Sequence, residues 1–495
     1  NTTASNNVAV GVYALEANTT GASNTAVGQA ALTDNTTGAN NTAVGYLASR
    51  VITTGSNNVS VGAGGNLGAN TTGANNVAVG YASLGGNTTA SNNTAVGFDS
   101  LAANTTGHSN VAMGLNALND NTTASYNTSV GAYSMDKTTT GSNNTAVGYQ
   151  ALEQNTTAYQ NTAVGVTSLK STTTGADNTG VGFSALFANT TGYDNTAVGK
   201  SSLVANTTGA TNTAVGSNAL VANTTGGANV AIGYQALDAN TTGGTNTAVG
   251  KAAMTANTTG SQNTAVGLAA LNANTTGTGQ TGVGYVALYN ATTGHSNTGI
   301  GSQALYSLTT GIENIAMGMQ AGQYNTAITT GNYNTILGAY SHASIAAAEH
   351  QIVLGYNVNS AGNNTVTIGK GHGSSDRIYN TYTSNATWTH SSDERLKKEI
   401  TSNNDCGLDF INSLRTVTYK WKAPSELDTT MYNYDANNSS VDYDKKMYGF
   451  VAQEVKAAMD THNITDFAGY SKLEDGIDNI EGISYEMFVV PLMKA

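Results

Sequence analysis

The stretch NTTGANNTAVG, residues 35–45, recurs along most of this 495-residue chain and decides its fold. Variants of its last five letters end in a glycine at 11, 28, 45 and 62, and then at 80, 97 and onward to 318. These glycines follow a 17-residue period, with one 18-residue step between Gly62 and Gly80. A fixed period that is too short for helix pairs and rich in β-branched residues predicts a parallel β-solenoid or β-roll with one coil per repeat.

The repeat continues less regularly to the glycines at 338, 355 and 369, so about 22 coils cover three quarters of the chain. Successive coils of a β-solenoid are spaced like neighbouring strands, ~4.8 Å apart, which predicts a shaft on the order of 100 Å long.

The strand of each repeat has a constrained pattern. The residue before the glycine is Val, Ile or Met, as at Val44, and two places earlier it is Thr, Val or Ile, as at Thr42. These two share one face of a strand, and the exchange of Thr for Val predicts a buried or half-buried lining. The residue between them, Ala43 here, is Ala, Ser or Gly in the regular repeats, which predicts close approach of another backbone to that face.

Other positions of the repeat have their own expected roles. A Leu four residues past the glycine, such as Leu32, is expected to supply a second buried apolar side chain. Asn35 and Gly38 of NTTG suit tight turns with positive φ. The Asn that opens each strand, as at Asn41, predicts a ladder of stacked side chains, and the variable residue after the glycine, as at Tyr46, is expected to face solvent.

A single stack of such coils is energetically marginal. Each coil buries two or three medium apolar side chains at about 1.5–3 kcal/mol apiece, whereas ordering its residues costs ~1–2 kcal/mol each. Three chains packed side by side on the strand face that carries Ala, Ser or Gly would compensate the shortfall in folding free energy and would explain why these residues are small. The repeats resemble the head repeats of trimeric autotransporter adhesins and similar modules of phage fibres, which implies a trimeric shaft.

Composition and charge exclude several functions. The lone Cys406 leaves no disulfide framework and no CxxC metal pair, and we expect neither cofactor nor metal. The net charge of −12 argues against nucleic acid as a partner. No apolar run approaches the ~20 residues of a membrane span. Acidic residues of the shaft, such as Glu153 and Asp238, stand singly. Without a carboxylate cluster, the sequence does not predict an enzyme that acts on polysaccharide.

The end of the chain is of another kind. Both tryptophans, both prolines and most charged residues lie beyond about residue 370. We therefore expect regular 17-residue repeats over 1–325, irregular terminal repeats over 326–375, a linker over 376–391 and a separate small domain over 392–495.

Three motifs in this last domain resemble a known family. They are SDERLK at 392–397, GFVAQEV at 449–455 and SYEMFVVPLMKA at 484–495. In this order they resemble the C-terminal intramolecular chaperone of phage tail fibres and tailspikes, the peptidase S74 domain. The resemblance implies a small α+β domain that trimerises, templates folding of the preceding β-structured fibre and then cuts itself off.

The resemblance also implies a self-cleavage site. The nucleophile would be Ser392 and the general base Lys397, and the bond between Ser391 and Ser392 would be cut. Asp393 and Arg395 match the motif and are expected to order the local structure. Such a reaction is at most a single turnover, and we expect no activity on an external substrate.

The same letters allow a purely structural interpretation. Ser391 and Glu394 fit a capping box at the start of a helix. On an ideal helix, residues five apart are separated by about 140°, which is poor geometry for a dyad. Ser392 would therefore have to lie in an extended segment ahead of the helix that carries Lys397.

Together these features predict a homotrimeric phage tail or side fibre, located on the virion and extracellular. Its expected partners are other virion tail components and a host cell-surface receptor, for which a glycan is one candidate; neither nucleic acid nor membrane insertion is expected. The alternative is a bacterial trimeric cell-surface adhesin, which shares the repeats but not the C-terminal motifs. Members of the resembled family usually continue into a long helix after a PLMKA-like segment, which implies a C-terminal coiled coil beyond residues 491–495.

Overall fold

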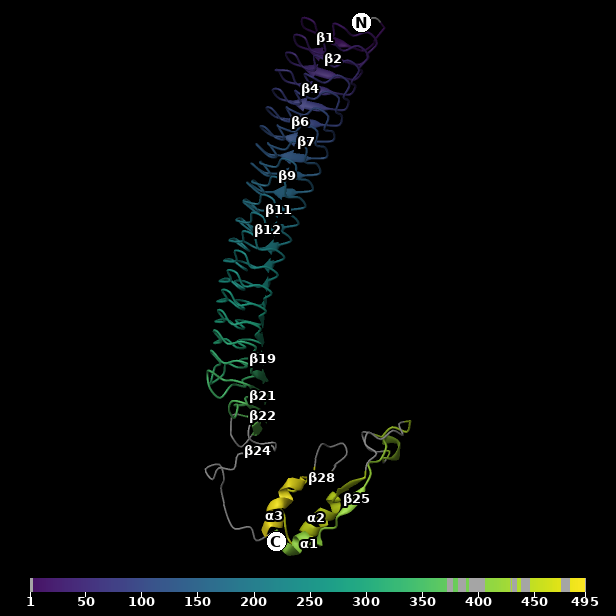
Figure 1. Cartoon of the computed structure of the whole chain (residues 1–495). Coiled ribbons are helices and arrows are strands. Elements are labelled where there is room, and N and C mark those ends of the chain that lie inside the picture. Colours follow the sequence, from purple (N-terminus) through teal and green to yellow (C-terminus); the bar gives the residue numbers. More distant parts are fainter. Residues whose placement is uncertain are drawn as a thin grey trace. The chain divides into compact units, whose positions relative to one another are not determined.

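The computed structural model describes residues 3–371, 377–381, 389–390, 406–427, 429, 434–437, 446–472 and 481–494. The chain divides into two compact units, Asn1–Ser391 and Ser392–Ala495. The first unit is a parallel β-solenoid and the second is a small domain of short helices and antiparallel strand pairs (Figure 1).

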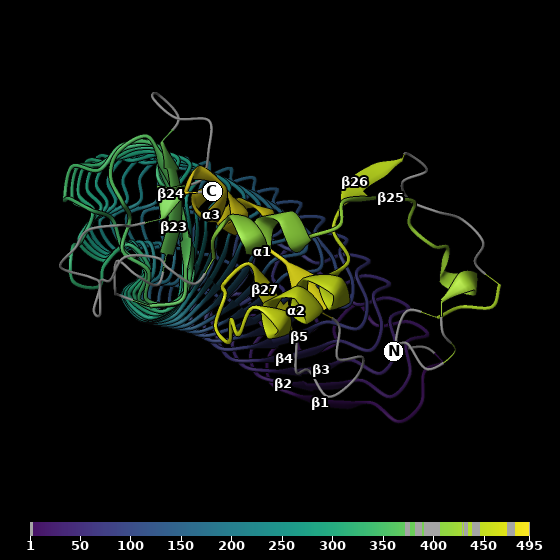
Figure 2. The same ribbon diagram turned by 90° about the horizontal axis from the view of Figure 1, so that it is seen from below.

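The solenoid is a stack of short strands, one per coil, that pair in parallel (Figures 1 and 2). In the regular repeats each residue pairs with its equivalent in the next coil, so Thr25 is paired with Thr42. The strands are β1 (Val8–Val10), β2 (Thr25–Val27), β3 (Thr42–Val44), β4 (Val59–Val61), β5 (Val77–Val79), β6 (Thr94–Val96), β7 (Val111–Met113), β8 (Thr128–Val130), β9 (Thr145–Val147), β10 (Thr162–Val164), β11 (Thr179–Val181), β12 (Thr196–Val198), β13 (Thr213–Val215), β14 (Val230–Ile232), β15 (Thr247–Val249), β16 (Thr264–Val266), β17 (Thr281–Val283), β18 (Thr298–Ile300), β19 (Ile315–Met317), β20 (Thr335–Leu337), β21 (Gln351–Gly355) and β22 (Thr365–Gly369).

Hydrogen bonds between coils continue outside the strands. The backbone N–H of Leu32 donates to the carbonyl of Ala48 at 3.1 Å, and that of Thr36 donates to Thr53 at 2.9 Å. Most of the backbone of each coil is therefore hydrogen-bonded to the coils before and after it. These bonds satisfy the backbone N–H and carbonyl groups that are buried in the narrow solenoid. This architecture confirms the predicted solenoid of 17-residue coils.

The strand faces are the reverse of those expected. Ala43 of β3 is fully buried, whereas Val44 is 36% exposed and Thr42 is half-buried. The predicted half-buried lining is confirmed for Thr42, but the fully buried face of the strand carries Ala43 rather than the β-branched pair. The small residue points into the coil, because the interior already holds Leu32 and leaves room for little more than a methyl group. The small residues therefore no longer argue for a close approach of other chains.

Asparagine ladders run through the interior as predicted. Asn41 is buried, and its side-chain amide donates to the carbonyl of Gly55 at 2.9 Å. Its side-chain oxygen accepts the backbone N–H of Asn58, one coil on, at 3.0 Å. The NTTG asparagines form a second ladder, in which Asn35 donates to the side-chain oxygen of Asn18 at 2.8 Å.

The positions with positive φ differ from those expected in NTTG. Asn35 and Gly38 do not have positive φ. Positive φ occurs instead at Gly28 (135°), at Leu32 (53°) and at Asn40 (58°), which precedes the ladder asparagine. The position of Gly38 is occupied by glycine or alanine along the repeats, because a Cβ at Gly38 would already lie 2.3 Å from the carbonyl oxygen of Gly55 and a larger side chain would not fit.

The end of the solenoid changes its pairing. β23 (Arg377–Thr381) pairs antiparallel with β22, and β24 (Thr389–His390) pairs antiparallel with β23. Two strands thus lie within the predicted linker, and the antiparallel pair ends the parallel stack.

The described part of the C-terminal unit contains short helices and two antiparallel strand pairs. β25 pairs with β26, and β27 pairs with β28. The elements are α1 (Leu408–Ser413), β25 (Val417–Tyr419), η3 (Pro424–Glu426), β26 (Met447–Gly449), α2 (Ala452–Thr461), β27 (Tyr470–Lys472), β28 (Glu481–Ile483), η4 (Tyr485–Phe488) and α3 (Val489–Lys494).

Candidate functional site

The C-terminal unit is organised around a small apolar core. Phe410 of α1, Met459 of α2 and Phe488 of η4 are buried together with Cys406, Val455, Ala458 and Ile464. The rings of Phe467 and Phe488 meet edge to face, with centroids 4.9 Å apart. This core joins the first helix of the unit to its last helical turns and fixes where the sequence motifs lie.

Two segments of this unit that are distant in the sequence meet through an ion pair. Arg415, in LRTVTYKWK before β25, donates from Nε to Oε2 of Glu454 at 3.0 Å, and its Nη2 contacts Oε1. Glu454 lies in the first turn of α2, within GFVAQEV. The hydrogen bond from Arg415 lowers the pKa of Glu454 and the bond to Glu454 raises the pKa of Arg415. Because both side chains are substantially exposed, the pair orients the two segments more than it stabilises them.

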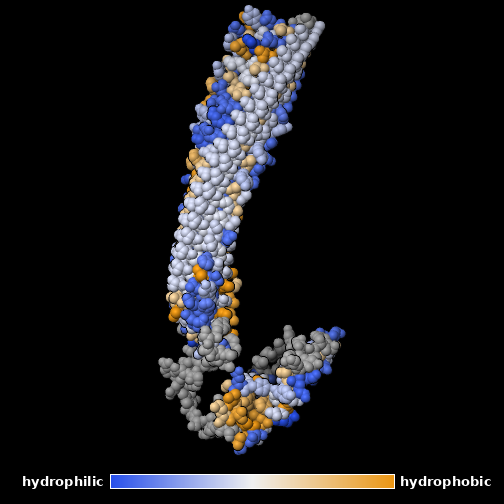
Figure 3. Space-filling model, viewed as in Figure 1, coloured by the Kyte–Doolittle hydropathy of each residue, from blue (hydrophilic) through white to orange (hydrophobic). Residues whose placement is uncertain are grey.

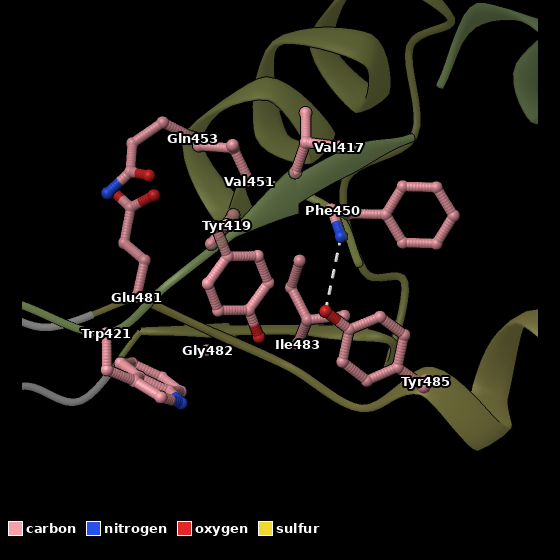
Figure 4. Close-up of a pocket in the computed structure, with 11 residues that line it drawn as sticks. Val417, Tyr419, Trp421, Phe450, Val451, Gln453, Glu481, Gly482, Ile483 and Tyr485 are labelled. Atoms are coloured by element: carbon pink, nitrogen blue, oxygen red, sulfur yellow. Dashed lines mark hydrogen bonds between the residues drawn. The ribbon is translucent and has the colours of Figure 1, made fainter. Parts of the chain in front are cut away.

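Between the two strand pairs lies an open cleft of about 430 Å³ (Figure 4). The Tyr485 hydroxyl accepts the backbone N–H of Phe450 at 3.2 Å, and a Cβ at Gly449 would lie 2.2 Å from that hydroxyl oxygen. Gly449 therefore lets η4 pack against the end of β26. The cleft is lined by Val417, Tyr419, Trp421, Phe450, Val451, Ala452, Gln453, Glu481, Gly482, Ile483 and Tyr485.

The unit also exposes large apolar side chains. Trp421 at the cleft is 59% exposed, Tyr448 is 77% exposed and Met493 of α3 is 82% exposed. An apolar patch is visible on this unit in Figure 3. Apolar exposure of this extent on a small domain is typical of a protein-binding surface.

The predicted cleavage residues lie outside the described residues. These are Ser391, Ser392, Asp393, Arg395 and Lys397. Their arrangement, and the choice between a dyad and a helix cap, stay predictions.

Comparison with known families supports the motif resemblance. Residues 392–464 match the family model Peptidase_S74, described as the chaperone of endosialidase. The C-terminal unit carries a chaperone-of-endosialidase domain. The match begins at Ser392, covers the first two quoted motifs and ends before SYEMFVVPLMKA. A search of the curated proteins finds no significant match to the chain.

The chaperone domain contains contacts that the sequence alone did not predict. Arg415 and Glu454 lie 39 residues apart in the sequence. Their opposite charges, in two segments that resemble the family, were the only sequence feature from which this contact could have been predicted. The packing of Tyr485 on Gly449 gave no such signal, because it depends on the fold of η4.

Two negative findings concern the described residues. Among them, no group of three or more His, Cys, Asp and Glu side chains is placed to hold a metal ion. No helix in the described part of the chain is long and apolar enough to cross a bilayer.

Proposed function

We propose that this protein is a homotrimeric tail or side fibre of a phage virion that attaches the particle to a host cell. In this proposal the solenoid forms the shaft, and the chaperone domain sets chain number and register before cutting itself off at Ser392. The observation that carries it is an apolar surface running along a solenoid that precedes a chaperone-of-endosialidase domain.

This surface, here called the apolar stripe, consists of the residues immediately before and after each strand-ending glycine. Its exposed apolar members are 36–62% exposed, and up to Gly355 the charged residues after the glycine are Lys200 and Lys251. On the face seen in Figure 3 the shaft is mostly neutral in hydropathy, with apolar groups near its edges. The exposed apolar members include Val27, Val44, Tyr46, Val61, Tyr81, Phe98, Met113, Leu115, Val147, Tyr149, Val164, Val166, Phe183, Val198, Val215, Ile232, Tyr234, Val266, Leu268, Tyr285, Met317, Met319, Leu337 and Tyr356.

The stripe is large enough for a stable interface. Eight Tyr and Phe side chains after the glycines are about half exposed. With 150–250 Å² per aromatic side chain, they leave ~800 Å² accessible, close to what each partner buries in a standard interface. The occupant has to repeat at the same spacing as the coils, and a second and third copy of this chain satisfy that requirement.

A separate assembly domain would prevent the shafts of the three chains from pairing out of register. Nearly identical coils can pair one coil out of register at little cost, because a shift by one whole repeat preserves most contacts. A globular domain with its own core and exposed apolar surface can fix the chains in register first. The apolar side chains around the cleft of Figure 4 are the surface we assign to that contact.

Release of the domain needs only groups in its first residues. In the proposed reaction, a neutral Lys397 accepts the hydroxyl proton of Ser392 while the oxygen attacks the carbonyl carbon of Ser391. The peptide C–N bond breaks, the nitrogen leaves as the protonated amine of Ser392, and water hydrolyses the resulting ester. A lysine acts as such a base only where its surroundings hold it uncharged.

Intact mass under denaturing conditions tests the release step. The freshly expressed chain and a Ser392→Ala variant are compared, with Ser402→Ala as a matched control. We expect a fragment ending at Ser391 in the parent and the control but not in the variant. Full-length mass in all three contradicts self-cleavage and makes the chaperone domain a permanent part of the fibre.

A further inference from the structure

One coil near the end of the solenoid is longer than the others. The step from Gly318 to Gly338 exceeds the regular 17-residue period, and Gly322 takes the place of the usual buried Leu. Ile328, which is fully buried, stands at the position of the NTTG asparagine, where Leu308 stands one coil earlier. The N–H of Ile328 donates to the carbonyl of Gly322 at 3.0 Å and closes a loop that carries the extra residues outward. Tyr324, within this loop, is 38% exposed.

The loop forms one wall of a hollow of about 480 Å³ on the shaft. Its position is fixed by hydrogen bonds: the side-chain oxygen of Gln323 accepts the backbone N–H of Ser307 at 3.0 Å. The Tyr324 ring contacts Tyr340 edge to face, with centroids 5.2 Å apart. The lining is Gln303, Tyr306, Gln320, Gln323, Tyr324 and Asn325.

The chemistry of this lining is specific. Four of the six residues are primary amides, which carry both donors and an acceptor, and two are tyrosines with a flat ring and a hydroxyl. The side-chain oxygens of Gln303 and Gln323 already accept hydrogen bonds from Gln320 and from the backbone of Ser307. None of the six is charged, so nothing in the lining would pair with a carboxylate, sulfate or phosphate. Neutral hydroxyl groups match the amides, and the apolar faces of a pyranose ring match the tyrosine rings.

We propose that this hollow binds a neutral saccharide. The assignment rests on the proposed attachment function and gives it a ligand class and a location. Tyr306 and Tyr324 supply ring contacts, while Gln320 and Asn325 exchange hydrogen bonds with sugar hydroxyls. Rings on two neighbouring coils allow more than one sugar unit to be held.

The test uses the full chain in saturation-transfer difference NMR. The probes are neutral oligosaccharides built from glucose, galactose, N-acetylglucosamine and fucose, with 3′-sialyllactose as the anionic comparison. We expect a signal from at least one neutral probe and a reduction of about five-fold or more in Tyr324→Ala. Tyr193→Ala, at an exposed tyrosine elsewhere on the shaft, is expected to leave the signal unchanged.

Three outcomes overturn the site: no neutral probe gives a signal, Tyr324→Ala binds as well as the parent, or sialyllactose gives the stronger signal. Sedimentation of the same samples separates this result from the fibre proposal. A trimer that binds no saccharide contradicts the site alone, whereas a monomer contradicts the fibre proposal.

Discussion

At the scale of single residues, the asparagine ladder links each coil to the next through buried hydrogen bonds. The buried side chain of Asn195 donates to the carbonyl of Gly209 at 2.9 Å and accepts the backbone N–H of Asn212 at 3.0 Å. In Asn195→Ala both backbone groups stay buried without these partners, at about 1–3 kcal/mol each. We expect a clearly lower midpoint of thermal unfolding, followed by circular dichroism. The exposed Thr208→Ala is the control, and equal midpoints in the two variants would contradict a structural role for the ladder.

Two kinds of glycine in the repeat should respond differently to alanine. Gly216 has a φ of 134°, and a Cβ there would lie 2.5 Å from the carbonyl oxygen of Gly233. Gly226 of NTTG does not have positive φ, and Ala90 and Ala124 already stand at its equivalent positions. We therefore expect Gly216→Ala to lower the unfolding midpoint more than Gly226→Ala, because only the first substitution combines a steric clash with a strained backbone. The opposite order would contradict the assigned conformations.

Asp136 makes the stability of the shaft depend on pH. Burial raises its pKa, as do Asp120 and Glu153, while the hydrogen bond and charge of Lys137 act in the opposite direction. Its Oδ1 is buried with no hydrogen-bond partner in the described part of the chain. A carboxyl whose pKa is higher in the folded state favours folding at low pH, and this contribution is lost as pH rises from the unfolded to the folded pKa.

We therefore expect Asp136→Asn to raise the unfolding midpoint at pH 7 and to have little effect near pH 3, where the parent side chain is protonated. Thermal unfolding at both pH values measures this. Asp194→Asn, at an exposed carboxylate several coils away from Lys137, is the control. A lower midpoint for Asp136→Asn at pH 7 would show that its contact with Lys137 outweighs burial.

Residue roles could be predicted from the repeat only in part. The asparagine ladder and the buried Leu32 followed from their recurrence at 17-residue spacing. The orientation of the strand could not be predicted in this way. Alternation of residue types along a strand defines two faces but does not show which of them is buried. The interior proved too narrow for Val44, so Ala43 points inward. Ser392 and Lys397 stay predictions, because they lie outside the described residues.

At the scale of elements, the coil is the unit of structure. Each regular coil pairs with the next at the same 17-residue separation in strands, ladders and turns alike. Deleting residues 201–217 joins Lys200 to Asn218 and removes one whole coil without changing any register. We expect the variant to keep its circular dichroism spectrum and an unfolding midpoint within a few degrees of the parent, since stability in such arrays is a sum over neighbouring repeats.

Deleting residues 201–208 is the matched comparison, because it removes about half a coil and moves every later ladder out of phase. We expect this variant to unfold at a clearly lower temperature or to aggregate. If the two deletions had the same effect, the coil would not be the unit of stability.

Some elements could not be predicted from the period. The long coil after Gly318 was visible as a change in glycine spacing, but the outward loop around Tyr324 depends on where the extra residues lie between Gly322 and Ile328. The antiparallel β23 and β24 fall where a linker was expected, because pairing with β22 requires no repeat in the sequence.

At the scale of the whole molecule, the proposed trimer uses a different surface from the one that the sequence suggested. The small residues of the strands line the interior of each coil, and the exposed residues on either side of the strand-ending glycine form the apolar stripe. The double variant Val198→Lys and Val215→Lys would place two charges within the stripe. We expect it to dissociate, whereas Thr191→Lys with Thr208→Lys, at exposed positions outside the stripe, should leave the assembly intact.

The central claim is that three chains assemble through this stripe, and the measurement that tests it most directly is sedimentation equilibrium of the full chain. The Ser392→Ala variant keeps the mass of each chain constant at 50.2 kDa. Our account predicts a particle of three times that chain mass, and a fall toward 50.2 kDa when Val198→Lys and Val215→Lys are added. A mass of 50.2 kDa for Ser392→Ala itself, at micromolar concentration, would contradict the account.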